Sequence, residues 1–199
     1  IRTPASCCGV FGLKPSRGRV SMSPGGEGWG SLSVQHAVTR SVRDSAALLD
    51  AVCQPEPGDP YWAPPPQRPF LEETQHEPGR LRIGFTTAAL TWGALDPQNL
   101  RGVRDTARLC ERLGHDVEEI VLPGNFQMMA MAVNVLVSAN ITAMLDREAE
   151  HRGAPIREDE IERLSWASYQ EGRRHTAVDY ARAMQTVHTF GRTFRGIFS

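Results

Sequence analysis

The sequence predicts an α/β protein, and three observations support this fold class. Two short apolar runs, residues 80–85 and 116–122, have the length and composition of strands. Residues 97–113 lie between them and show an amphipathic helical pattern. A strand–helix–strand unit with short turns favours parallel strands joined by a right-handed crossover. Helical periodicity on both sides of this unit is the third observation.

The first helix predicted in chain order covers residues 41–53. Ser41 can accept a hydrogen bond at the start of this helix, and Asp44 places negative charge in its first turn. Residues 55–69 follow with seven prolines, a density that predicts an extended surface strap rather than a helix or strand. This strap is either a domain boundary or a connection across one domain.

The central helix, residues 97–113, has clear start and end signals. Asp96 is a favourable N-cap, Pro97 occupies the first helical position, and Gly114 follows the last apolar residue. We expect one stripe of this helix to be buried, namely Leu100, Val103, Ala107, Cys110 and Leu113.

A second long helix is predicted from Asn125 to about Arg152. Its apolar run, MMAMAVNVLVSANITAML, predicts a helix buried on most sides. Ser138, Asn140 and Thr142 are embedded in this run and need hydrogen-bond partners. They either bond to the local backbone or face a ligand cavity.

A charged segment, residues 157–163, separates this helix from the last one. Thr176 and Asp179 form a start signal for the last helix. Its apolar positions indicate helix packing rather than a coiled coil, and they are Tyr180, Met184, Val187, Gly191, Phe194 and Phe198.

Composition excludes several classes of function. A formal net charge of −1 over 199 residues gives no basic surface for nucleic acid or an acidic membrane. No apolar run approaches the ~20 residues of a membrane helix, and Pro4 and Gly9 interrupt any signal-peptide core. Four cysteines without a CxxC pair, and the absence of HExxH, argue against zinc. We therefore expect reduced, buried thiols.

Self-contained catalytic motifs are also missing. The sequence has no GxSxG elbow, and its six histidines are scattered along the chain. The GVFG segment, residues 9–12, lacks the spacing of a phosphate-binding loop. A nucleophilic Cys7 or Cys8 is disfavoured, because small apolar neighbours do not supply the electropositive setting that a reactive thiolate needs.

The first 21 residues, IRTPASCCGVFGLKPSRGRVS, resemble the second half of the signature of the amidase signature family. Residues 39–52, TRSVRDSAALLDAV, are similar to the Arg-Ser-Val-x-Asp-x-Ala helix of that family. Residues 81–85 and 111–123 form a third similar block, so the resemblance covers most of the chain. The matched positions in the first block are Ile1, Arg2, Pro4, Ala5, Gly9, Gly12, Leu13, Lys14, Pro15, Gly18, Arg19 and Val20.

The resemblance implies an amidase-signature fold, a twisted mixed sheet covered by helices on both faces. It also implies amide hydrolysis by a Ser–Ser–Lys triad without metal or organic cofactor. By this alignment the acylated serine directly precedes Ile1, while the lysine and the bridging serine lie further upstream. Residues 1–199 would then be part of one domain, truncated at both ends, and would contain none of the catalytic residues.

The resemblance assigns supporting roles to several residues. Ile1, Arg2 and Pro4 would continue from the nucleophile into a turn or short helix and position it. Cys7 and Cys8 would pack behind the active serine. The other expected site lies on the apolar helix, where Asn140 and Thr142 would form a wall of the acyl-binding pocket and favour aliphatic or aromatic acyl chains.

Two departures from the common family pattern point to a subgroup. Gln35 and His36 replace a common Gly-Pro, and Ser16 replaces a frequent threonine. Residues 25–38 and the strap instead resemble the subgroup that includes 6-aminohexanoate cyclic dimer hydrolases. We therefore expect a small-molecule amide as substrate, a cytoplasmic location, and no nucleic-acid or membrane partner, and we leave a homodimer open. The alternatives are a protein similar to the glutamyl-tRNA amidotransferase subunit of the same family and a non-catalytic binding relative.

Overall fold

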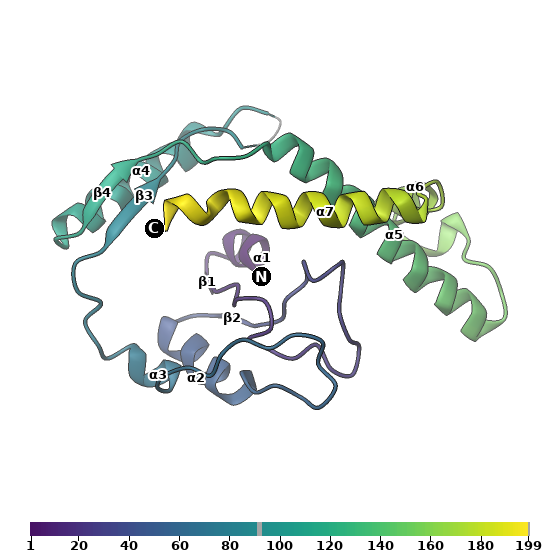
Figure 1. The fold of residues 1–199 in the computed structure, drawn as a ribbon, viewed down its shortest axis with the longest axis horizontal. Helices are drawn as coiled ribbons and strands as arrows, with labels where there is room; N and C mark the ends of the chain where they lie inside the picture. Colours follow the sequence, from purple (N-terminus) through teal and green to yellow (C-terminus); the bar gives the residue numbers. More distant parts are fainter. Residues whose placement is uncertain (91–92, 199) are drawn as a thin grey trace. The chain divides into compact units, whose positions relative to one another are not determined.

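A computed structural model describes residues 1–90 and 93–198 of the chain. The chain divides into two compact units, Ile1–Glu77 and Pro78–Ser199, which are described separately (Figure 1). The boundary at residue 77 lies beyond the proline-rich strap, so the strap is a connection within the first unit. That both units belong to one domain of a longer protein stays a prediction.

The first unit contains short elements joined by long loops: α1 (Arg2–Cys8), β1 (Phe11–Gly12), β2 (Val38–Thr39), α2 (Val42–Val52) and α3 (Phe70–Glu73). Strands β1 and β2 pair antiparallel, with Phe11 opposite Thr39. The predicted N-cap of α2 is confirmed, because Ser41 Oγ accepts a hydrogen bond from the Asp44 N–H at 3.1 Å. A small core holds this unit together and includes Ala5, Ala46, Leu49 and Cys53.

The second unit begins with the predicted strand–helix–strand arrangement. Strands β3 (Arg82–Phe85) and β4 (Asp116–Glu119) pair in parallel, and Ile83 lies opposite Val117. Helix α4 (Pro97–Arg112) connects them, with the Asp96 carboxylate accepting from the Gln98 N–H at 2.6 Å. The parallel pair and the predicted start of the helix are therefore confirmed.

The apolar stripe of α4 is covered less than the sequence predicts. Ala107 is buried, and Leu100 and Cys110 are half-buried. Val103 is 37% exposed and Leu113 is 66% exposed, so the expectation of burial is wrong for these two. The reason is geometric, because two strands of four residues cannot cover the whole of a helix of 16 residues.

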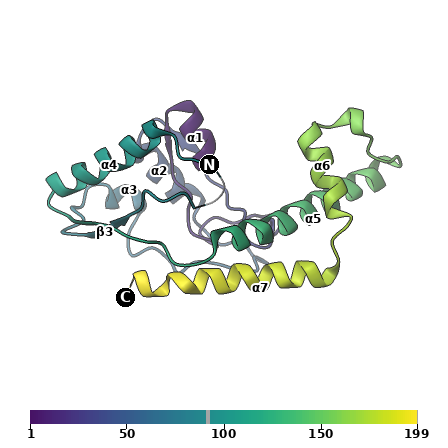
Figure 2. The ribbon, with the colours of Figure 1, turned by 90° about the horizontal axis from the view of Figure 1, so that it is seen from above.

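The rest of the second unit is helical and consists of α5 (Phe126–Arg152), η1 (Glu158–Glu160), α6 (Arg163–Gly172), α7 (Ala177–Thr193) and η2 (Phe194–Ile197). Helix α7 runs beside α5, and α6 packs on the C-terminal part of α5 (Figure 2). The predicted start of α7 is a capping box, in which Thr176 Oγ1 accepts from the Asp179 N–H at 3.1 Å. The predicted last helix changes to a 3₁₀ turn at Phe194, which leaves Phe198 85% exposed.

Helix α5 is more exposed than expected. Only Ala132, Leu136 and Ser138 are buried among its residues, while Met131 and Met144 are 55% and 60% exposed. The cause is that α6 and α7 contact only part of the helix surface. By length and composition α5 could cross a membrane, since a window of 18 residues within it has a mean hydropathy of 1.7, which corrects our expectation that no apolar run is long enough. Core helices of soluble proteins pass the same test.

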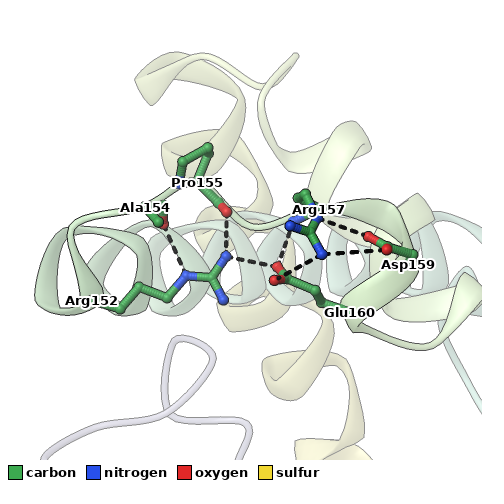
Figure 3. Close-up of polar contacts among 6 residues, drawn as sticks. All are labelled: Arg152, Ala154, Pro155, Arg157, Asp159 and Glu160. Carbon is green, nitrogen blue, oxygen red and sulfur yellow. Dashed lines mark hydrogen bonds and ion pairs between the residues drawn. The ribbon is translucent and has the colours of Figure 1, made fainter.

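The charged segment after α5 folds back on the end of that helix (Figure 3). Arg152 Nε donates to the Ala154 carbonyl at 2.9 Å, and its Nη2 contacts Glu160 Oε2 at 2.7 Å. Glu160 Oε2 also accepts from the Arg157 N–H at 2.9 Å, and Arg157 pairs with Asp159. These polar contacts close the loop between α5 and α6.

In the described part of the chain, the strands form two separate two-stranded sheets rather than one mixed sheet. One is antiparallel and belongs to the first unit, and the other is parallel and belongs to the second. The overall class is nevertheless α/β, as predicted.

Candidate functional site

The expected nucleophile-supporting residues form the start of α1. Ile1 is the N-cap, and its carbonyl accepts a hydrogen bond from the Ala5 N–H at 3.0 Å. Ile1 is half-buried, whereas Arg2 and Pro4 are exposed. At the other end, Gly9 adopts the left-handed conformation, with φ of 63°, and the Val10 N–H donates to the Ala5 carbonyl at 3.0 Å. A short helix therefore follows Ile1, and its role in supporting a nucleophile stays a prediction.

Gly12 brings strand β1 into direct contact with α1. A Cβ atom at Gly12 would lie 2.5 Å from Ala5 Cβ and 3.2 Å from the Ile1 carbonyl oxygen. Real Cβ atoms do not approach other atoms this closely, so any larger residue would push the helix away. The match of Gly12 to the family signature therefore has a physical reason, which is the close packing of β1 on the first residues of the chain.

The segment after β1 is positively charged. Lys14 donates through Nζ to the Pro15 carbonyl at 2.7 Å. Partial burial, followed by repulsion from Arg2 and Arg17, lowers the pKa of Lys14 below its usual value. Lys14 and Arg17 thus form a cluster of basic side chains with Arg2 of α1.

None of the four cysteines, all of them in the described part of the chain, forms a disulfide. Cys7 and Cys8 are exposed on α1, Cys53 is buried and Cys110 is half-buried. The expectation of buried thiols is therefore wrong for Cys7 and Cys8, because α1 buries Ala5 and leaves these two side chains exposed. In the described residues no cluster of His, Cys, Asp and Glu has the arrangement of a metal site.

The polar residues of α5 have partners within the second unit. Ser138 Oγ donates to the Asn134 carbonyl at 2.7 Å, and Asn140 Nδ2 donates to the Leu136 carbonyl at 2.8 Å. These two bonds go to the local backbone, which is one of the two alternatives that the sequence leaves open, the other being a ligand cavity. Thr142 Oγ1 instead donates to the Tyr169 carbonyl of α6 at 3.0 Å. Asn140 Nδ2 also reaches Tyr180 Oη of α7 at 3.4 Å.

Helices α5 and α6 touch backbone to backbone at Gly172. A Cβ atom at this position would lie 2.2 Å from Thr142 Oγ1 and 2.3 Å from the Ser138 carbonyl oxygen. This contact sets the position of Thr142, a residue of α5, against α6. The sequence carries one weak signal for it, a glycine inside a helical stretch.

A polar cluster of Asp146, Tyr169 and Arg173 also joins α5 to α6. Tyr169 Oη donates to Asp146 Oδ1 at 2.6 Å, and Arg173 Nη2 contacts the same oxygen at 2.8 Å. The hydrogen bond from Tyr169 lowers the pKa of Asp146, and the same bond raises the pKa of Tyr169. The Arg173 guanidinium also stacks over the Tyr169 ring at 4.6 Å. No periodic pattern in the sequence predicts this cluster, because Asp146 lies 23 residues before Tyr169 and on a different helix.

The two predicted groups of site residues lie in different units. Ile1, Arg2 and Pro4 belong to the first unit, and Asn140 and Thr142 belong to the second. Each group is locally ordered, and the roles that we assign to them stay predictions.

Comparison with known proteins identifies the family. An amidase family model matches residues 1–199. A 6-aminohexanoate-cyclic-dimer hydrolase of Paenarthrobacter ureafaciens is 36% identical over 171 residues, which cover 83% of this chain and 35% of that protein. A glutamyl-tRNA(Gln) amidotransferase subunit of Thermus thermophilus is 35% identical over 147 residues, covering 74% of this chain and 30% of that protein.

The fold comparison agrees. The solved structure of a 6-aminohexanoate cyclic dimer hydrolase in complex with substrate has a TM-score of 0.89 and 32% identity. The match covers 97% of this chain and 41% of that structure. The chain therefore belongs to the amidase family, has its α/β fold, and spans about two fifths of the length of this structural relative.

Proposed function

We propose that residues 1–199 are part of an amidase that hydrolyses carboxamide C–N bonds through a serine acyl-enzyme. The observation that carries the proposal is the match of an amidase family model to the whole chain, beginning at Ile1. The short helix α1 and its close contact with β1 at Gly12 support it, because a helix packed in this way is suited to hold the residue that precedes Ile1.

In the proposed reaction, the serine before Ile1 attacks the amide carbonyl carbon. An unactivated serine is a weak nucleophile, so its proton must pass to the upstream bridging serine and lysine. The same groups return a proton to the leaving amine, and water then hydrolyses the acyl-enzyme. The residues of this chain position the nucleophile and shape the acyl site.

The proposed substrate is a small amide with an aliphatic or aromatic acyl chain. The apolar run of α5, residues 128–145, which contains few polar groups, supports this class. Similarity to 6-aminohexanoate cyclic dimer hydrolases supports an aliphatic chain in particular. A homodimer and a cytoplasmic location stay predictions.

The test uses the longer protein that contains residues 1–199 with their upstream segment. Replacing the residue before Ile1 by alanine should abolish hydrolysis of an aliphatic amide, and the 1–199 chain alone should be inactive. Hydrolysis by the isolated chain would contradict the proposal. The second candidate function is that of an amidotransferase subunit, and similarity to such a subunit supports it. Glutamine-dependent transfer of ammonia by the longer protein would identify this function.

The pocket role of α5 needs its own test in the longer protein. Asn140→Ala should raise KM for the amide with little change in kcat, if the amide group of Asn140 contacts the acyl chain region. Tyr180→Phe is the matched control, because it removes the hydroxyl that Asn140 reaches at 3.4 Å but leaves Asn140 in place. Equal effects of both variants on KM would assign Asn140 to helix packing instead.

A further inference from the structure

The proline-rich strap, residues 55–69, is held by polar contacts rather than by burial. Most of its residues are exposed, including Tyr61 at 51% and Trp62 at 69%. Asp59 and Ala63 are among the few that are half-buried. An extended, solvated segment of this kind makes no internal backbone ladder. Its position must therefore depend on the residues that it contacts.

Three of those contacts go to one short segment, residues 18–21, which directly follows the basic cluster. The Ala63 N–H donates to the Gly18 carbonyl at 2.7 Å. Arg19 Nη1 donates to the Pro64 carbonyl at 2.7 Å, and Ser21 Oγ donates to Asp59 Oδ1 at 2.8 Å. The second oxygen of Asp59 accepts from the Glu56 N–H at 2.9 Å, which fixes the bend at the start of the strap.

The contact at Gly18 leaves no room for a side chain. Gly18 has a φ of +71°, and a Cβ atom there would lie 3.0 Å from the backbone carbon atoms of Trp62. The far end of the strap is also fixed, because the Asp50 carboxylate of α2 accepts from the N–H groups of Phe70 and Leu71 at 2.6 and 2.8 Å. The Arg19 guanidinium lies over the Phe70 ring at 5.6 Å.

The segment that the strap holds leads back to the start of the chain. Five residues, with a buried Pro15 among them, separate Gly18 from Gly12. Gly12 is the residue that packs on Ala5 and Ile1. A displacement of residues 18–21 should therefore also displace α1, because only the short turn of residues 13–17 connects this segment to Gly12. The hydrogen bond from Lys14 to the Pro15 carbonyl partly fixes this turn.

From this geometry we propose that the strap is a brace that positions α1, and with it the residue before Ile1. Gly18, Arg19 and Asp59 are positioning residues in this proposal, since they act through α1 and touch no reacting atom. The effect on catalysis rests on the proposed function, whereas the effect on the order of α1 does not.

The experiment uses the longer amidase that contains residues 1–199, as wild type and as the variants Gly18→Ala, Asp59→Ala and Arg19→Met. Arg68→Met is the matched control, because Arg68 also lies in the strap but only forms an ion pair with Glu73, at 3.5 Å. Arg19→Lys tests rescue, since a lysine can still donate to the Pro64 carbonyl. Hydrogen exchange is measured at the Ala63 amide and at three amides that bond to the backbone of α1 and its N-cap, those of Ala5, Gly9 and Val10, which we call the α1 amides.

If the strap is a brace, the three variants should speed exchange at the α1 amides about tenfold, because local opening sets the exchange rate there. They should also lower kcat about tenfold with KM nearly unchanged, since small displacements of a reacting group cost this much or more. Arg68→Met should match wild type, and Arg19→Lys should recover part of the loss. If Gly18→Ala does not fold, Arg19→Met and Asp59→Ala are compared with wild type and with Arg68→Met instead.

Faster exchange at Ala63 with unchanged exchange at the α1 amides would overturn the proposal, because the strap would then be only locally ordered. Faster exchange at α1 with an unchanged kcat would overturn the positioning role. Absence of amide hydrolysis by the wild-type protein would instead contradict the proposed function, and the exchange at α1 would still decide whether the strap is a brace.

Discussion

The two units of the chain are stabilised in different ways. In Ile1–Glu77 the elements are short, and side chains that bond to distant backbone groups fix the loops, as Asp50 does for the start of α3. In Pro78–Ser199 long helices pack on each other, and Gly172 permits a close contact between two of them. Beyond its small core, the first unit therefore depends on single polar groups to fix its loops, whereas the second depends on the fit of helix surfaces.

The largest effect should come from breaking the helix contact of the second unit. Gly172→Ala places a Cβ atom 2.3 Å from the Ser138 carbonyl oxygen, so α5 and α6 must separate. We expect a loss of about 3 kcal/mol in the free energy of unfolding, the upper range for overpacking. Urea denaturation measures it.

Gly102→Ala in α4 is the matched control for that substitution. A Cβ atom at Gly102 meets nothing within 4 Å. Alanine should therefore stabilise the helix by up to about 1 kcal/mol, the usual difference in helix propensity. Similar destabilisation by both variants would show that the α5–α6 contact is not the determining feature.

A smaller effect is expected from removing one polar anchor of the first unit. Asp50→Ala deletes the acceptor for the Phe70 and Leu71 N–H groups, and we expect a loss of about 1–2 kcal/mol. Asp50→Asn keeps one acceptor oxygen and should lose about half as much. Thermal unfolding followed by circular dichroism gives the comparison, and equal stability of Asp50→Ala and wild type would refute the dependence on polar anchors.

The smallest effect concerns the charged loop of the second unit, which resembles the first unit in its dependence on polar groups (Figure 3). The hydrogen bond from Arg152 lowers the pKa of Glu160 below its ordinary value of 4.5. A carboxyl group whose pKa is lower in the folded than in the unfolded state stabilises the folded state at pH values above the unfolded pKa. This contribution is lost as the pH falls through the folded pKa.

Backbone protection in residues 153–162 should therefore be constant at neutral pH and should fall as the pH drops below about 4.5. Glu160→Gln should remove this dependence and lower the protection at neutral pH. Hydrogen exchange between about pH 3 and 7, a window that contains the ordinary carboxyl range, measures the effect. A wild-type profile without this acid-side loss would contradict the assignment to Glu160.

Features set by neighbouring residues in the chain were predictable from the sequence. The N-caps Ser41, Asp96 and Thr176 were predicted correctly, because a cap depends on the three or four residues that follow it. The parallel pairing of β3 and β4 was also predicted, since a crossover helix of this length leaves few other topologies.

Features that depend on distant parts of the chain were not predictable in this way. Strands β1 and β2 have two residues each, too few for any periodicity, and their pairing depends on the loop between them. The exposure of Leu113 and of Cys7 follows from how much surface the neighbouring elements cover, which a periodic pattern does not contain. The contacts of Gly172 and Asp59 likewise join residues far apart in sequence.

We propose that the chain supports a serine nucleophile located immediately before Ile1. The direct measurement is to treat the longer protein with a serine-directed fluorophosphonate and to locate the label by peptide mass spectrometry. We expect one labelled serine, at the position that precedes Ile1, and no label on the isolated 1–199 chain. A label on a residue within 1–199, or an unlabelled protein that still hydrolyses amides, would contradict it.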